Sequence, residues 1–326
     1  MYTSYFINTH THTLIFMVRD ALIGLAVGDA LGVPVEFTSR AMLDADPVVD
    51  MRGYGSHWQA PGTWSDDSAL TFCLAEVLVG GYDLKALADS FTRWLYQGHW
   101  TANGDVFDVG IATRQAIDRL KQGCEPTRAG GAQEPDNGNG SLMRILPLVF
   151  FIRTLPMEQR FTRTREVSSL THRHIRSVIA CFYYLEFARL LLEGKPREAA
   201  YQELKDTIAG FLRAQDIPAN EIVLFGRLLE GDIATLPREQ IQSSGYVLHT
   251  LEASIWCLMT ASTYSEAVLN AVNLGADTDT TGAVTGGSAG MVFGQEQIPK
   301  AWLSELKRLA DIERLADDLA RSTAHM

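Results

Sequence analysis

Cysteine is scarce in this sequence, and its spacing does not suggest a disulfide framework. The four residues stand far apart, at Cys73, Cys124, Cys181 and Cys257, whereas folds stabilised by disulfides are cysteine-dense. Three of the four occur in apolar segments with helical periodicity, where a reduced and buried thiol is typical. We therefore expect free thiols and a reducing, cytoplasmic compartment.

Long apolar runs are also missing. A membrane-spanning helix needs about 18 or more consecutive apolar residues, and the longest runs here are interrupted sooner by charged residues such as Arg144, Glu186 and Glu252. The sequence therefore predicts a protein without a membrane-spanning segment and without a membrane partner.

The first 18 residues contain no lysine or arginine ahead of the short apolar run at 14–18, which argues against a signal peptide. Two interpretations stay open. Either Met17 is the true first residue, or the polar residues 1–18 form an N-terminal arm outside a domain that covers residues 19–322.

Basic residues are outnumbered. The chain has 28 lysines and arginines against 39 acidic residues, for a net charge of −11. This balance argues against a nucleic-acid partner, because a phosphate backbone is recognised mainly by basic side chains. It is compatible with a site that gathers carboxylates around cations, and a solvated acidic surface would explain it equally well.

Strand-like alternation, internal repeats and a long linker are absent from the sequence, while helical periodicity recurs along it. The pattern therefore predicts one all-α domain. The segments expected to be helical are residues 20–33, 69–78, 84–95, 175–192, 196–214 and 220–229, an apolar helix that follows residues 245–252 and ends near Met259, and a surface helix at 300–320.

Two predicted helix starts carry the same unusual chemistry. Each combines carboxylates with hydroxyls, at Ser65, Asp66 and Asp67 and again at Asp277, Asp279 and Thr280. Such residues can simply cap a helix. If the two starts meet, however, each like-charge pair at about 4 Å costs roughly 4 kcal/mol at an effective dielectric constant of about 20. Bound cations would offset that repulsion, and a donor set made only of oxygens favours Mg²⁺ or Mn²⁺ over zinc, with Ca²⁺ also possible.

Glycine repeats at every fourth position in two places, which is one face of a helix. The rows are Gly24, Gly28 and Gly32, and Gly282, Gly286, Gly290 and Gly294. Because each interior glycine costs a helix about 1 kcal/mol relative to alanine, we expect both rows to pack very closely against neighbouring elements.

Three further polar features accompany these segments. Asp29 lies within the first glycine row and is expected to be buried and hydrogen-bonded, while Glu36 follows on a loop and Asp108 precedes a helix that it could cap. A glycine-rich loop at 138–141 is expected to open a helix, where backbone N–H groups favour phosphate. It matches neither the P-loop nor the dinucleotide fingerprint.

Six motifs occur in the order typical of one family. They are Gly-Asp-Ala-Leu-Gly at 28–32 with Glu36, Trp-Ser-Asp-Asp at 64–67, Phe-Asp-Val-Gly at 107–110, Gly-Asn-Gly-Ser-Leu-Met-Arg at 138–144, Leu-Thr-His at 170–172 and Gly-Ala-Asp-Thr-Asp-Thr at 275–280. On these motifs, over roughly residues 20–295, the chain resembles the ADP-ribosylglycohydrolases, whose bacterial members include the dinitrogenase reductase-activating glycohydrolase.

The resemblance implies an orthogonal helical bundle with a binuclear Mg²⁺ or Mn²⁺ centre in a central cleft. By motif position the metal ligands are Ser65, Asp66, Asp67, Asp277, Asp279 and Thr280, and many members have Thr where this chain has Ser65. The resemblance also makes Glu36 a loop acid that approaches the metals and can gate the site. It assigns the diphosphate to Gly138, Asn139, Gly140 and Ser141, the region of the ribose or leaving group to Asp108 and His172, and adenine stacking to Tyr246.

The implied activity is removal of ADP-ribose from an ADP-ribosylated protein, with arginine as the expected acceptor. Water activated by the metal pair would attack the anomeric carbon, with Asp66 or Asp67 accepting its proton and Asp108 assisting the departing guanidine. Two alternatives remain: hydrolysis of another ADP-ribose linkage, on serine, nucleic acid or a small metabolite, and an immunity protein that blocks a cognate ADP-ribosyltransferase, partly through residues 1–18.

Overall fold

A computed structural model describes residues 2–326, with side chains described from Leu14 onward. Within this part of the chain, all regular structure is helical and the only β-type contacts are two isolated bridges. The all-α prediction is therefore confirmed. The helices are α1 (Tyr2–Gly32), α2 (Arg40–Ala45), α3 (Asp66–Gly80), α4 (Leu84–Gln97), α5 (Ile111–Lys121), α6 (Leu148–Ile152), α7 (Met157–Ser169), α8 (Ile175–Leu192), α9 (Arg197–Ala214), α10 (Ala219–Val223), α11 (Gly226–Leu229), α12 (Val247–Thr260), α13 (Tyr264–Val272), α14 (Thr278–Phe293), α15 (Lys300–Glu305) and α16 (Leu309–Thr323).

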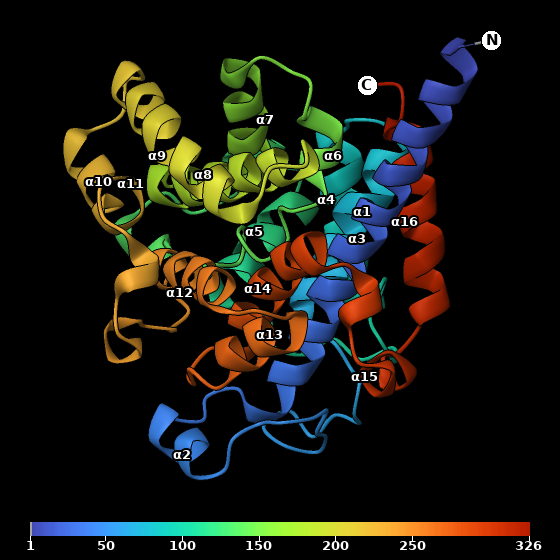
Figure 1. Cartoon of the computed structure of the whole chain (residues 1–326), viewed down its shortest axis with the longest axis vertical. Helices are drawn as coiled ribbons and strands as arrows, with labels where there is room; N and C mark the ends of the chain where they lie inside the picture. The colour runs from blue at the N-terminus through green and yellow to red at the C-terminus, as the bar shows by residue number, and fades with distance from the viewer. Residues whose placement is uncertain (1) are drawn as a thin grey trace.

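The centre of the bundle is α14, whose residues from Thr278 to Met291 are all buried. It packs against α1, α12 and α13, and Figure 1 shows it between α1 and α16 on one side and α8, α9 and α12 on the other. A helix that is apolar or small on all sides has to be surrounded by protein. This central position carries the acidic start of α14 into the interior.

The two glycine rows pack against each other. A Cβ atom added at Gly28 would lie 2.1 Å from the carbonyl oxygen of Gly282, and one added at Gly286 would lie 2.3 Å from that of Gly24. No side chain fits between backbones this close. We call the six residues of this contact the glycine seam, namely Gly24, Gly28 and Gly32 of α1 and Gly282, Gly286 and Gly290 of α14.

Gly294 is the exception to the predicted row. It lies just beyond α14 as the C-terminal cap with φ 80°, and an added Cβ would meet no atom within 4 Å. Its role is to end the helix in a backbone conformation that other residues rarely adopt.

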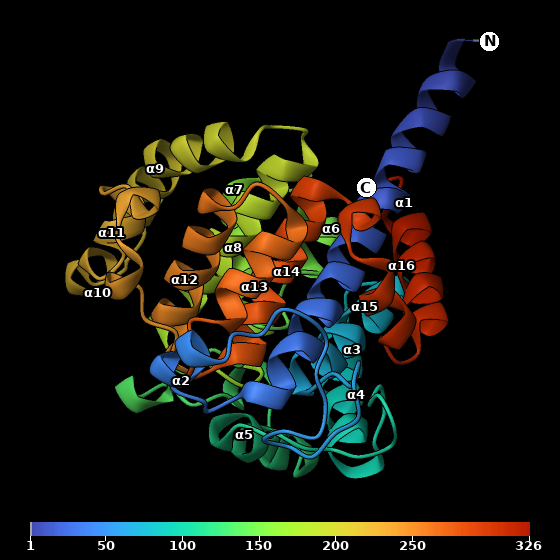
Figure 2. The ribbon, with the colours of Figure 1, turned by 60° about the horizontal axis from the view of Figure 1, so that its bottom comes forward.

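Helix α1 begins far earlier than the predicted start at Asp20. Its backbone is helical from Tyr2, and Figure 2 shows its N-terminal end extending past the bundle. Met1 and the side chains of residues 2–13 lie outside the described part of the chain, so the predicted arm falls mostly there. At the other end, Pro34 lies in a 3₁₀ turn (Val33–Val35), which ends the helix as expected.

Three expected boundaries were wrong. Helix α5 begins at Ile111 with Gly110 as its N-cap, so Asp108 is not the cap. The glycine-rich loop at 138–141 leads into turns, and α6 begins only at Leu148, so the loop does not open a helix. The predicted helix at 300–320 is broken into α15 and α16 at Arg308, which adopts φ 49°.

The thiol prediction is confirmed: Cys73, Cys181 and Cys257 are free and buried, and Cys124 is free and half-buried. Among the described helices, none combines the length and apolar character needed to cross a bilayer.

Candidate active site

Asp29 organises the start of α3. Its carboxylate accepts hydrogen bonds from the backbone N–H groups of Ser65 (3.0 Å) and Ser68 (3.0 Å) and from the Ser68 hydroxyl (2.6 Å). The Ser65 hydroxyl in turn accepts from the N–H of Asp67 at 3.2 Å, as an N-cap does. The prediction of a buried, hydrogen-bonded Asp29 is therefore confirmed, and its function here is to satisfy the first N–H groups of α3.

The start of α14 meets the start of α3. The Thr278 hydroxyl donates to the carbonyl of Gly32 (2.8 Å), which ties α14 to the end of α1. The hydroxyls of Ser65 (2.8 Å) and Thr280 (3.4 Å) both donate to Oδ2 of Asp67. The juxtaposition on which the predicted metal site depends is therefore present.

Three carboxylate oxygens at this junction are buried without a hydrogen-bond partner. They are Oδ1 of Asp67, Oδ1 of Asp277 and Oδ2 of Asp279. Because an unpaired charge in the interior is very costly, such a set is compatible with one or more bound cations. Two groups of three carboxylates, each with oxygens within 4.8 Å of one another, surround these atoms: Asp29, Asp67 and Asp279, and Glu36, Asp277 and Asp279. Oxygen donors alone suit a hard divalent cation.

Burial raises the pKa of the acidic side chains in this cluster. The pKa values of Asp66, Asp67 and Asp279 lie well above the usual range, first because of desolvation and next because of nearby carboxylates. The pKa of Glu36 rises to about 10, from burial and from the charges of Asp108 and Asp277. A divalent cation would offset both effects, because it favours the ionised form of each carboxylate.

These shifts predict a pH-dependent response to metal. The folded, metal-free protein holds protons that the unfolded chain releases near its ordinary carboxyl pKa of about 4, so its stability falls as pH rises above that value. Cations need the ionised carboxylates and bind better at higher pH. We expect excess Mg²⁺ or Mn²⁺ to raise the melting temperature more at about pH 8 than at about pH 5, measured by thermal denaturation against a chelator control. An equal shift at both pH values would contradict this arrangement.

The acidic cluster forms the floor of a cleft of about 490 Å³. That volume is within the usual range for a small-molecule site. Acidic side chains and the glycine-rich loop both contribute to its lining. Of the residues singled out from the sequence, the cleft is lined by Glu36, Asp66, Asp108, Gly138, Asn139, Gly140, His172, Asp277 and Thr280.

The glycine-rich wall is held rigidly. The Asn139 amide donates to Oδ2 of Asp277 (2.8 Å) and to the Thr250 hydroxyl (2.9 Å), which joins the loop to the acidic floor. Behind the loop, the fully buried Arg144 donates to the carbonyl of Gly140 and to that of Val167 (3.3 Å). A cation behind a loop of small residues favours an anionic ligand at this wall.

His172 closes the wall from below. A Cβ atom added at Gly140 would lie 2.7 Å from its Cε1 atom, so the loop lies directly on the imidazole ring. Burial and the charge of Arg144 lower its pKa to about 3. His172 is therefore neutral at physiological pH and offers a hydrogen-bonding ring without a charge.

The other predicted residues do not line the cleft. Ser65, Asp67 and Asp279 are buried behind the floor, which Asp66, Asp277 and Thr280 line. Ser141 is fully buried, and its hydroxyl accepts a hydrogen bond from that of Ser168 (2.9 Å). Tyr246 is the N-cap of α12 and half-buried beside the cleft, with its ring edge-on to His249. The adenine-stacking role of Tyr246 stays a prediction.

His57 belongs to the site but was missed in the sequence. Its Nε2 atom is hydrogen-bonded to Oε2 of Glu36 and lies 3.8 Å from Oδ1 of Asp108, so it joins two segments of the acidic wall. Its ring lies between those of Phe37 and Phe107, with centroids 5.9 and 5.2 Å away. No local pattern marks this residue, because it stands in a loop and meets its partners only in the folded chain.

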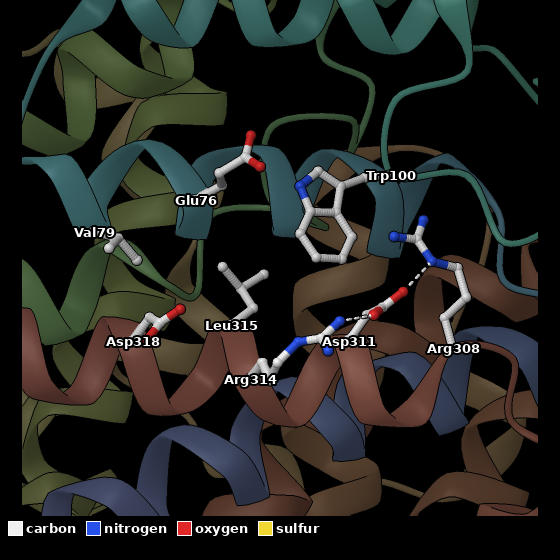
Figure 3. Close-up of a pocket in the computed structure, with 8 residues that line it drawn as sticks. All are labelled: Glu76, Val79, Trp100, Arg308, Asp311, Arg314, Leu315 and Asp318. Carbon is white, nitrogen blue, oxygen red and sulfur yellow. Dashed lines mark hydrogen bonds and ion pairs between the residues drawn. The ribbon is translucent and has the colours of Figure 1, made fainter.

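A second hollow, of about 290 Å³, lies between α3 and α16 (Figure 3). Its acidic side chains are paired: Asp311 bonds both Arg308 (2.7 Å) and Arg314, and Glu76 and Asp318 pair with residues outside the hollow. It contains none of the six motifs found in the sequence. The acidic cleft is therefore the better candidate for chemistry.

A helical bundle that gathers buried carboxylates at two helix starts beside a cleft is compatible with a metal-dependent enzyme. The sequence model of the ADP-ribosylglycohydrolase family matches residues 11–325. The chain belongs to the ADP-ribosylglycohydrolase family and is a glycohydrolase, which confirms the resemblance seen in the motifs.

Individual relatives cover most of the chain. It is 33% identical to the ADP-ribosylarginine hydrolase Tri1 of Serratia proteamaculans, over 92% of this chain and 78% of that one. It is 30% identical to the ADP-ribosyl-[dinitrogen reductase] glycohydrolase of Rhodospirillum rubrum, over 92% and 94%. A solved structure described as an ADP-ribosylglycohydrolase-related protein complex superposes with a TM-score of 0.79 at 32% identity, covering 96% of this chain and 99% of that one.

Proposed function

We propose that this protein hydrolyses the N-glycosidic bond that links ADP-ribose to an arginine side chain of a protein. The observation that carries the proposal is the set of unpaired, buried carboxylate oxygens of Asp67, Asp277 and Asp279, which lies at the floor of a cleft with a glycine-rich wall. The arginine acceptor is supported by the similarity to the ADP-ribosylarginine hydrolase of Serratia proteamaculans.

We infer that two divalent cations, Mg²⁺ or Mn²⁺, are held by the residues of the two helix starts, namely Ser65, Asp66, Asp67, Asp277, Asp279 and Thr280. When bound, such ions supply positive charge that polarises ligand oxygens and lowers the pKa of water. Asn139 would keep Asp277 in position, because its amide already bonds that carboxylate and the Thr250 hydroxyl.

The substrate would lie across the cleft with its diphosphate against Gly138, Asn139 and Gly140. Small residues let an anion approach the backbone, and the buried charge of Arg144 supports it from behind. Neutral His172 could bond a ribose hydroxyl, and Tyr246 is the proposed support for adenine. The anomeric carbon would then face the acidic wall, where a carboxylate can stabilise an oxocarbenium-like transition state.

Proton transfer is assigned within the acidic wall. Asp66 lines the cleft, whereas Asp67 lies deeper and accepts bonds from two hydroxyls. Asp66 is therefore the better acceptor for the proton of the attacking water. Asp108, also at the cleft, is placed to assist the departing guanidine. Glu36, with its pKa near 10, holds a proton at neutral pH in the metal-free protein, and it faces both Asp108 and His57.

The test is a panel of substrates in which ADP-ribose is joined to arginine, to serine or to a nucleic-acid base. With Mg²⁺ or Mn²⁺ present, we expect release of ADP-ribose from the arginine conjugate at a rate at least tenfold above that from the others. Preference for serine or for a base would replace the arginine assignment with that linkage. Cleavage of none of them would favour the alternative in which residues 1–18 block an ADP-ribosyltransferase.

A further inference from the structure

Large aromatic side chains stand exposed on the loop of residues 54–58 and at Phe37, which lines the cleft. Trp58 is 76% exposed, Phe37 72% and Tyr54 57%, and the rings of Tyr54 and Trp58 meet edge to face with centroids 5.7 Å apart. Soluble proteins seldom leave neighbouring aromatics in water unless the surface contacts a partner. Tryptophan and tyrosine are also the residues that most often dominate binding at interfaces.

The loop that carries these rings is pinned in place. The N–H of Ser56 donates to the carbonyl of Pro34 (3.0 Å), and its hydroxyl donates to that of Glu36 (2.6 Å). A Cβ atom added at Gly55 would lie 1.7 Å from the Pro34 carbonyl oxygen, so the two segments are in backbone contact. The exposed rings are thus held ready on a rigid support, which lowers the entropy lost on binding.

The backbone at these rings is unusual. Phe37, Tyr54 and Trp58 all adopt positive φ, at 64°, 59° and 54°. Bulky residues rarely take this conformation, and it is found mostly where function requires it. The three rings at these positions are exposed to solvent, so they contribute little buried apolar surface to the fold.

The exposed surface is continuous with the cleft. Phe37 and Ile111 both line the cleft, and both are more than 70% exposed, at 72% and 79%. His57, between Tyr54 and Trp58 in the loop, contacts the Phe37 ring. We call the four residues Phe37, Tyr54, Trp58 and Ile111 the hydrophobic rim.

The rim lies at the acidic end of the cleft. Phe37 follows Glu36 directly and Ile111 comes three residues after Asp108, and both acids line the cleft. The glycine-rich wall, where the diphosphate is proposed to lie, comes from residues 138–140. A guanidinium at the acidic end has complementary charge, and the chain attached to it has to leave the cleft past the rim.

We propose that the hydrophobic rim binds the polypeptide that flanks the ADP-ribosylated arginine, so that the enzyme recognises protein as well as ADP-ribose. The inference rests on the proposed function. It assigns Trp58 and Tyr54 to substrate affinity rather than to chemistry, because neither lines the cleft.

The experiment compares two arginine-linked substrates, a folded protein ADP-ribosylated on arginine and ADP-ribosyl-agmatine, which lacks a polypeptide. The variants are Trp58→Asn and Tyr54→Asn, because asparagine tolerates positive φ. For each we expect kcat/KM on the protein to fall about tenfold, mainly through KM, while kcat/KM on ADP-ribosyl-agmatine stays unchanged. The conservative variant Trp58→Phe should keep most of the wild-type kcat/KM on the protein substrate. The control Val223→Asn removes an exposed apolar side chain on α10 outside the rim, and it should leave kcat/KM unchanged on both substrates.

Each other outcome has a distinct meaning. Unchanged activity on the protein substrate in both rim variants would refute polypeptide binding by the rim. Turnover of ADP-ribosyl-agmatine would still support the proposed function. An equal loss of activity on both substrates would also refute polypeptide binding by the rim, and it would mean that the loop maintains the shape of the cleft. No turnover of either substrate by the unmodified enzyme would refute the proposed function itself.

Discussion

Replacement of Asp279 by Asn is expected to lower kcat/KM for hydrolysis of ADP-ribosyl-arginine by on the order of 10³-fold. Oδ2 of Asp279 is buried without a partner, and the carboxylate belongs to both acidic groups at the junction of α3 and α14. Removing its charge weakens both proposed cation positions at once. The measurement is steady-state kinetics with saturating Mg²⁺ or Mn²⁺.

Stability separates this effect from misfolding. Asp279 is fully buried, and its pKa is raised first by desolvation and then by repulsion from Glu36, Asp108 and other acids. Neutralising it should therefore leave the melting temperature of the metal-free protein unchanged or higher at about pH 8, while the increase caused by metal becomes smaller. A merely structural carboxylate would give the opposite result, a lower melting temperature without metal.

A matched control is Asp318→Asn. Asp318 lies in the second hollow on α16 (Figure 3). Its side chain is 53% exposed and pairs with Arg321. Its replacement should change neither activity nor the response to metal, because a surface ion pair contributes little. Wild-type activity in Asp279→Asn would remove the two-helix metal site from the mechanism.

Gly28→Ala is expected to lower the free energy of unfolding strongly. The new methyl group would lie 2.1 Å from the carbonyl oxygen and 2.6 Å from the carbonyl carbon of Gly282. Backbone atoms cannot rotate away, so α1 and α14 must separate along the glycine seam. Overpacking of this kind costs about 3 kcal/mol or more, which outweighs the gain of about 1 kcal/mol from higher helix propensity.

Gly210→Ala provides the comparison, because it makes the same substitution inside another helix. Gly210 lies in α9, and an added Cβ would meet no atom within 4 Å. Helix propensity then acts alone, and we expect stabilisation of up to about 1 kcal/mol. Urea denaturation of both variants gives the two free energies of unfolding. A Gly28→Ala protein as stable as the wild type would show that the seam can open without cost.

The acidic residues of the two helix starts could be singled out from the sequence because their chemistry is local. Asp66 and Asp67 follow a capping serine, and Asp277, Asp279 and Thr280 stand at the next helix of the same kind, so each half is recognisable in a few consecutive residues. The glycine rows were equally clear, since a four-residue repeat defines a helix face. What the spacing did not predict is that the two rows pack against each other.

Residues whose role depends on distant partners could not be assigned. His57 enters the site only because loops near residues 36 and 108 come together around it. Asp108 has the sequence context of a helix cap, yet its φ of 51° turns the chain so that Gly110 caps α5 instead. Ser141 belongs to the glycine-rich motif, but its hydroxyl bonds into the core. Tertiary contacts decided each case, and no local pattern contains them.

The glycine seam also determines when the enzyme can first work. It pairs the beginning of the chain with a helix near its end, and Gly32 lies against Asp279 itself. Asp67 leaves the ribosome 212 residues before Asp279, which at synthesis rates of about 5–20 residues per second is roughly 10–40 s. Throughout that interval the nascent chain has only half of its acidic cluster. With the proposed site, catalysis begins only after translation has almost ended, and we expect a truncated product that lacks α14 to be inactive however well its first helices fold.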